Sequence, residues 1–201
     1  SAQIFHCGTL SLTHPDCRAA TMKALYAARN AGIPISVDPN LREPLWNNAE
    51  DAKKAIRLVL EYADIIKISD YEIEFLYGEA DVVKGSKRLC REFSPKVLFA
   101  TCGKDGAYLF KEDIVLHCPC FSSVKTIDTT GAGDSFCGTA LSKLLDYGLD
   151  FDALDREKCA DLLCYASAAA SLTTAKRGAI PAMPSKEEIE ALITNEKIEI
   201  K

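Results

Sequence analysis

A run of small residues between two aspartates spans residues 128–134, with the sequence DTTGAGD, and it leads directly into a helix-length segment. The first N–H groups of a helix have no partner inside the helix and lie at the positive end of its dipole. Because Gly131, Ala132 and Gly133 carry almost no side-chain bulk, an anion can approach these N–H groups closely. Asp134 follows at once, and its carboxylate is suited to accept a proton from a hydroxyl group that attacks phosphorus. The segment therefore predicts phosphoryl transfer, and a glycine-rich turn with Asp134 as helix N-cap is the structural alternative.

A second glycine-containing loop, with the sequence TCGKDG over residues 101–106, follows a short apolar run. Glycines at the end of a strand permit a tight turn and a close approach of a ligand to the backbone, and a plain hairpin turn is the alternative. The chain has no GxxxxGK[ST] pattern and no HRD or DFG pattern. It therefore gives no support to a P-loop nucleotidase or to a protein kinase.

Polar residues also follow the apolar run that ends at Val37, in the string DPNLREPLW over residues 38–46. Ligands of open parallel sheets bind beyond the carboxyl ends of the strands. Asp38 and Asn40 place polar groups at a turn there, and the guanidinium of Arg42 is suited to a phosphate or a carboxylate. The structural alternative is an Asx turn at Asp38 and Asn40, with Arg42 paired to Glu43 or another nearby acid.

A further apolar run, at 65–68, is followed by Ser69, Asp70, Tyr71 and Glu72. Lys67 at the end of this strand can reach a nucleotide phosphate, and a solvated lysine is the alternative. Glu72 is either a functional acid or a surface carboxylate at the start of a helix.

Short apolar runs alternate with helix-length segments, which predicts an α/β fold with a parallel sheet. The expected strands are 4–7, 33–37, 65–68 and 97–101, followed by a hairpin-like stretch at 107–118. The expected helices are 16–30, 48–62 with Asn48 as the cap, 70–77, 82–93, 131–147, 156–174 and 186–194.

The composition narrows the class of protein. The 201 residues include 24 Lys and Arg against 29 Asp and Glu, a net charge of −5, which argues against a nucleic-acid-binding surface. No apolar run approaches the ~20 residues of a membrane span, and the start does not resemble a secretory signal. The nine cysteines are scattered without a CxxC pair, which indicates reduced thiols in a cytoplasmic protein. A strand end is favoured over a metal site for Cys118 and Cys120.

The motifs at 38–46, 67–72, 101–106 and 128–134 resemble those of the ribokinase-like, or pfkB, carbohydrate kinases. The string at 38–46 is similar to that of the fructokinase branch. The resemblance covers residue 4 to about residue 192 and lacks the family's N-terminal part, and the start at Ser1 without Met agrees with a fragment. It implies one ribokinase-like nucleotide-binding and catalytic domain over residues 1–201. This domain would be a three-layer α/β/α structure with a mostly parallel central sheet and no β-lid.

The resemblance also implies a role for each matching residue. Asp134 would be the catalytic base, and Gly131, Ala132 and Gly133 would form the anion hole. Glu72 would organise magnesium through water, although Ser69 replaces the asparagine that is usual in the family. The implied nucleotide-binding residues are Lys67, Thr101, Gly103, Gly106 and Gly178. The implied substrate or phosphate residues are Asp38, Asn40 and Arg42. The residues implied near a monovalent cation are Asp128 and Thr130, and Ala182 stands where the family often has a serine.

These roles predict ATP-dependent transfer of a phosphoryl group to a primary hydroxyl of a sugar, with fructose giving fructose 6-phosphate as the favoured case. ATP, Mg2+ and K+ are the expected cofactors. A cytoplasmic location and a homodimer are compatible with the family, and no nucleic-acid or membrane partner is expected. Ribose, 2-keto-3-deoxygluconate and a nucleoside stay open as substrates. The alternative function is a non-catalytic module or partner subunit that binds a nucleotide or a sugar phosphate.

Overall fold

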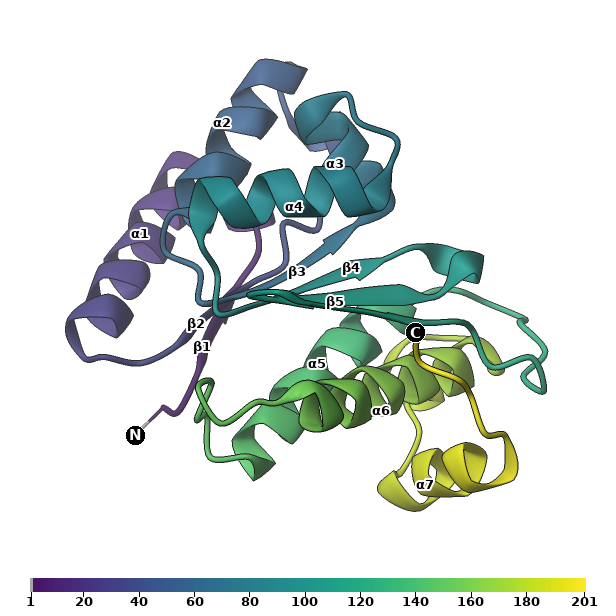
Figure 1. Ribbon diagram of the computed structural model, residues 1–201. Coiled ribbons are helices and arrows are strands. Elements are labelled where there is room, and N and C mark those ends of the chain that lie inside the picture. The colour runs from purple at the N-terminus through teal and green to yellow at the C-terminus, as the bar shows by residue number, and fades with distance from the viewer. Residues whose placement is uncertain (1) are drawn as a thin grey trace. The chain divides into compact units, whose positions relative to one another are not determined.

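The computed structural model describes residues 2–201 (Figure 1). One sheet has the strand order β1-β2-β3-β4-β5-β6. The strands are β1 (Phe5–Cys7), β2 (Ile35–Val37), β3 (Ile65–Ser69), β4 (Val97–Thr101), β5 (Ala107–Lys111) and β6 (Ile114–Cys118). The helices are α1 (Pro15–Asn30), α2 (Ala49–Leu60), α3 (Asp70–Tyr77), α4 (Val82–Phe93), α5 (Ala132–Asp146), α6 (Arg156–Thr174) and α7 (Lys186–Asn195). The expected α/β class is therefore confirmed.

The contacts within the chain divide it into two compact units. Unit 1 comprises residues 1–100 and 110–112, and unit 2 comprises residues 101–109 and 113–201. The expectation of one domain over residues 1–201 stays a prediction.

Unit 1 is built on parallel strands. β1 pairs with β2 in the register Phe5 to Ile35, and β2 pairs with β3 in the register Ser36 to Ile65. β2 and the first four residues of β3 are buried, as expected for parallel strands that helices cover. The helices α1 to α4 lie together in this unit (Figure 1). Because parallel strands end at the same edge of a sheet, the segments that follow β2 and β3 can meet there.

The helices of unit 1 begin at residues that can cap them. The side chain of Asn48 accepts the Asp51 N–H at 2.9 Å at the start of α2, as the sequence predicts. Asp81 accepts the Lys84 N–H at 3.0 Å at the start of α4. The bounds of α3, α4, β4 and α6 are those expected from the sequence, and the remaining elements differ by one to two residues at their ends.

Unit 2 is built on α5 and α6, which pack along each other, with α7 against α6 (Figure 1). Phe121, Ala168, Ala169 and Ile189 form a buried cluster that joins α6 to α7. The small residues of α6 allow this close approach. Cys118 is the buried last residue of β6, in agreement with the strand end favoured from the sequence. Among residues 2–201, no helix is long and apolar enough to span a membrane.

A turn that requires glycine follows β4. Gly106 has a φ of 91°, and a Cβ atom at this position would lie 2.1 Å from the carbonyl oxygen of Cys118. Gly103, in the same turn, has a φ of 52° with no atom within 4 Å of such a Cβ. The loop at 101–106 therefore packs tightly against the end of β6 only at Gly106.

We expect Gly106→Ala to lower the free energy of unfolding by about 3 kcal/mol, because it adds a backbone clash to the cost of a left-handed conformation. Gly103→Ala is the matched control, and it should cost about 1 kcal/mol, since only the backbone conformation opposes it. Urea unfolding of the two variants measures both values. Equal losses in the two variants would contradict the packing described here.

Candidate functional site

The start of α5 leaves backbone N–H groups without a side-chain cap. Gly131 occupies the N-cap position with a φ of 80°, and no side chain accepts a hydrogen bond there. Ala132 donates its N–H to the Thr129 carbonyl at 3.2 Å. Within residues 2–201 the structure gives no partner to the N–H groups of Gly131 and Gly133. Asp134 lies in the first turn of the helix and is exposed, so its carboxylate is free to meet a ligand in solvent.

Gly131 cannot be replaced by a larger residue without moving its surroundings. A Cβ atom at this position would lie 2.8 Å from the Cβ atom of Ala179, and the positive φ adds a second restriction. Two segments far apart in the sequence thus approach each other at the start of α5. The glycine makes this approach possible and keeps the helix start open.

Asp128 holds the loop that precedes α5. Its Oδ1 accepts the N–H of Thr130 at 2.9 Å and the hydroxyl of Thr130 at 2.7 Å. Its Oδ2 accepts the Gly178 N–H at 3.1 Å. These hydrogen bonds, those from Thr130 first, favour the ionised carboxylate and lower the pKa of Asp128 to about 2. The structure thus joins three residues of the predicted site, Asp128, Thr130 and Gly178.

A cavity of about 340 Å³ lies in unit 2 beside these segments. Thr101, Gly103 and Gly106 line one part of it, and Ala132 and Gly133 line another. The other lining residues include Phe121, Val124, Phe136, Ser167, Ser171 and Thr174. A mainly apolar cavity with a few polar groups and open backbone amides can hold a flat ring system with an attached phosphate group.

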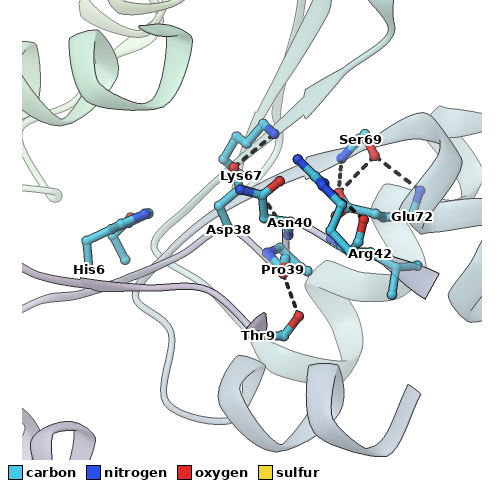
Figure 2. A network of polar contacts seen from close by, with 11 residues as sticks. His6, Thr9, Asp38, Pro39, Asn40, Arg42, Lys67, Ser69 and Glu72 are labelled. Atoms are coloured by element: carbon cyan, nitrogen blue, oxygen red, sulfur yellow. Dashed lines mark hydrogen bonds and ion pairs between the residues drawn. The ribbon is translucent and has the colours of Figure 1, made fainter. Parts of the chain in front are cut away.

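A buried ion pair joins the residue after β2 to the middle of β3 in unit 1 (Figure 2). Lys67 Nζ lies 3.0 Å from Asp38 Oδ2, and these residues are 7% and 3% exposed. Asp38 Oδ1 accepts the Asn40 N–H at 3.1 Å. Burial raises the pKa of Asp38 to about 6, against the lowering effect of the Lys67 ammonium group. The Asx turn expected as the structural alternative is confirmed, and a solvated Lys67 is wrong.

Glu72 is also buried, with 4% of its surface exposed. Its Oε1 accepts the Leu41 N–H at 2.8 Å (Figure 2). Its Oε2 accepts the N–H and the hydroxyl of Ser69, each at 2.8 Å. Ser69 in turn caps α3, so the two residues form a capping box. The alternative of Glu72 as a carboxylate at the start of a helix is confirmed for its place and wrong for its exposure, and its role with magnesium stays a prediction.

Arg42 is exposed, and the residues before it are held in place. Its Nη1 donates to the Leu41 carbonyl at 3.0 Å. Among the described residues no ion pair joins Arg42 to Glu43, whose carboxylate accepts the hydroxyl of Tyr71 instead. The expected structural pairing of Arg42 is thus not formed, and its guanidinium is available to a ligand.

Sequence reasoning named Ser69 and Glu72 but missed the contact between them, and it missed other residues of these sites altogether. The Ser69-x-x-Glu72 pattern was a readable signal for a capping box, since Ser followed three residues later by Glu is its usual form. Thr9, whose hydroxyl donates to the Pro39 carbonyl at 2.6 Å, carried no comparable signal. The aromatic lining of the cavity by Phe121 and Phe136 also depends on tertiary packing. No pattern of spacing along the chain indicates it.

The side chains do not fit a cation that the protein alone would hold. In the described part of the chain, no group of three or more His, Cys, Asp or Glu side chains is arranged to bind a metal ion. Both oxygens of Glu72 and both oxygens of Asp128 already accept hydrogen bonds. Carboxylate oxygens that bind Mg2+ need a lone pair directed at the ion or at its water shell. Most lone pairs of these two carboxylates are already directed at protein donors.

The comparisons with known proteins agree with the motifs. A family profile described as pfkB family carbohydrate kinase matches residues 1–186. Fructokinase-2 of Solanum lycopersicum is 42% identical over 193 residues, which are 96% of this chain and 58% of that protein. The chain thus spans well under two thirds of the length of this curated relative.

Two solved structures are similar along nearly the whole chain. Fructokinase from Vibrio cholerae O395, bound to fructose, ADP and calcium ion, has a TM-score of 0.83 at 27% identity, covering 96% of this chain and 62% of that one. Aminoimidazole riboside kinase from Salmonella enterica, in complex with aminoimidazole riboside and an ATP analogue, has a TM-score of 0.82 at 27% identity. It covers 95% of this chain and 62% of that one.

We expect Lys67→Met to lower the free energy of unfolding by about 3–5 kcal/mol at neutral pH, because it leaves the Asp38 carboxylate buried without its cation. The cost should shrink below pH 6, since a carboxyl with a raised pKa takes up a proton there and no longer buries a charge. Lys87→Met, at an exposed lysine, should cost less than about 0.5 kcal/mol. A loss in Lys67→Met that is independent of pH would contradict the buried charge pair.

We expect the Asp128 carboxyl to titrate near pH 2 in the folded protein, as measured by carbon-detected NMR. A lowered pKa means that the contribution of Asp128 to stability is present above its ordinary pKa of about 3.8 and is lost as the pH falls through about 2. Thr130→Val removes one of its donors and should raise this pKa toward the ordinary value. An unchanged titration in Thr130→Val would show that this hydroxyl does not stabilise the carboxylate.

Proposed function

Because this chain belongs to the pfkB family of carbohydrate kinases, we propose that it carries the nucleotide-binding and catalytic part of an ATP-dependent sugar kinase. The observation that carries the proposal is the start of α5, where the N–H groups of Gly131 and Gly133 are open beside the exposed Asp134. ATP would occupy the cavity that Thr101, Gly103 and Gly106 line. Gly178, which donates its N–H to Asp128, would bind the nucleotide from the segment after α6.

In the proposed reaction, Asp134 accepts the proton of a primary hydroxyl on the sugar. The hydroxyl oxygen forms a bond to the γ-phosphorus, and the bond from that phosphorus to the β–γ bridging oxygen breaks, which releases ADP. The amides of Gly131, Ala132 and Gly133 stabilise the negative charge on the phosphoryl group as it moves. For Ala132 this requires its N–H to leave the Thr129 carbonyl, which it meets at a long 3.2 Å.

Arg42, Asp38 and Asn40 are proposed to act on the sugar or the phosphate, with Arg42 supplying the free charge. Lys67 is proposed to attract the nucleotide phosphate by its positive charge and not by a direct hydrogen bond, since its ammonium group already contacts Asp38. Mg2+ would enter with the phosphates of ATP, and the reaction steps above do not depend on a protein-held ion. Asp128 and Thr130 are proposed to bind a monovalent cation. In this role the cation would take the place of the hydrogen bond that the Thr130 hydroxyl donates to Asp128.

Fructose is the proposed sugar. The support is the 42% identity to a fructokinase and the structural likeness to a fructokinase bound to fructose. A kinase for a riboside is the second candidate, because the structure is equally similar to that of aminoimidazole riboside kinase. The nine scattered cysteines, which form no CxxC pair, support the proposal of a reducing, cytoplasmic setting, and a homodimer is proposed from the family alone.

A non-catalytic module that binds a nucleotide or a sugar phosphate is a further candidate. The observation that favours it is the cavity of unit 2, which together with the open amides of Gly131 and Gly133 can bind a nucleotide without a sugar. Binding of ATP with no sugar-dependent release of ADP would support this module over the kinase.

We expect Asp134→Asn to lower kcat by about 10²–10⁴-fold, the usual contribution of general base catalysis, while ATP binding changes less than about twofold. Asp146→Asn, at an exposed aspartate in the last turn of α5, is the control and should leave kcat unchanged. Release of ADP with fructose, ribose or a riboside measures turnover, and calorimetry with ATP measures binding. Turnover that persists in Asp134→Asn would remove this residue from the mechanism.

A further inference from the structure

The segment from Asp38 to Leu41 is held at each successive residue. Asp38 binds Lys67, and the Pro39 carbonyl accepts both the hydroxyl and the N–H of Thr9. The Asn40 N–H donates to Asp38, and Asn40 adopts a positive φ of 49°. The next link is the Leu41 N–H, which donates to Glu72 across 31 positions of sequence. Arg42 follows directly and is exposed.

The Glu72 carboxylate is buried, and three of its four lone-pair sites already accept hydrogen bonds. Three donors converge on it, the N–H of Leu41 on one oxygen and the N–H and hydroxyl of Ser69 on the other, all at 2.8 Å. It lies in the first turn of α3, where the helix dipole stabilises its negative charge. A water molecule of a magnesium shell would have to reach the one remaining lone pair, on Oε1, of a side chain that is 4% exposed, or displace one of these charge-assisted hydrogen bonds.

We infer that Glu72 is a positioning residue, which fixes Leu41 and thereby the direction in which the chain presents Arg42, and that it does not belong to the magnesium shell. The inference deepens the proposed function, and only its effect on turnover rests on that function. Glu72 ties the start of α3 to the segment after β2, so two strand ends of unit 1 are held in one arrangement (Figure 2).

Hydrogen exchange at the Leu41 amide tests this link directly. In Glu72→Gln the one remaining carbonyl oxygen should face the two donors of Ser69, which leaves the NH₂ group, which cannot accept, against the Leu41 N–H. The Leu41 N–H should therefore exchange at least about tenfold faster. Ser69→Ala is the matched control, because it removes the cap hydroxyl and keeps the bond from Glu72 to Leu41, and exchange there should change less than about threefold. Urea unfolding accompanies both variants. If Glu72→Gln does not fold, Glu72→Asp, which keeps the charge and shortens the reach, takes its place. Unchanged exchange at Leu41 would overturn the inference.

The dependence of turnover on Mg2+ separates positioning from metal binding. A positioning role predicts that kcat of Glu72→Gln falls about tenfold at every Mg2+ concentration, with the half-saturating concentration unchanged. It also predicts that Glu72→Gln combined with Arg42→Gln is no slower than Arg42→Gln alone, because Glu72 acts through Arg42. Recovery of turnover at high Mg2+ would overturn the inference. If the unaltered chain shows no turnover with any sugar, the proposed function fails, and exchange at Leu41 still decides the role of Glu72.

Discussion

Backbone N–H groups at the start of a helix have no partner inside the helix and must find one in a side chain, in water or in a ligand. In most helices of this chain a side chain accepts them, as Asn48, Ser69, Asp81, Asp155 and Ser185 do. At α5 the N-cap is Gly131, which has no side chain to offer. The positive φ of Gly131 and its approach to Ala179 make a larger residue costly at this position. The proposed site depends on this open helix start. It also includes the loop at 128–130, the neighbouring cavity and Asp134.

The two units keep their polar segments in place in different ways. In unit 2, backbone amides and one ionised aspartate hold the loop before α5, and the neighbouring cavity has mainly apolar walls. In unit 1, buried charges hold the segment after β2, through the pair of Asp38 and Lys67 and through the carboxylate of Glu72. Buried charges are tolerated only when they are paired or fully hydrogen-bonded, so each of these groups is tightly constrained. Constraint of this kind favours a site in which a free group such as Arg42 meets its ligand in a fixed direction.

Much of the fold follows from local sequence, because its signals act within a few residues. The bounds of α3 and α4 were predictable from Ser69, Gly78 and Asp81, which start or end helices by short-range hydrogen bonds or by left-handed backbone. The glycine-rich segment at the start of α5 was equally readable, since the anion binding proposed for it depends on the absence of side chains. The ion pair of Lys67 with Asp38 and the hydrogen bond of Glu72 with Leu41 were not predictable, because the partners lie about 30 residues apart and are brought close only by parallel strand pairing. The surface alternatives for these two residues failed for that reason.

The central claim is that the open amides at the start of α5 bind a phosphate-bearing ligand. The most direct measurement is the NMR shift of the N–H groups of Gly131, Ala132 and Gly133 during a titration with ATP. The account predicts large, saturable shifts at these three amides, together with shifts at Gly103 and Gly106 in the cavity wall. Saturable binding of ATP that leaves the three amides of the α5 start unshifted would contradict it.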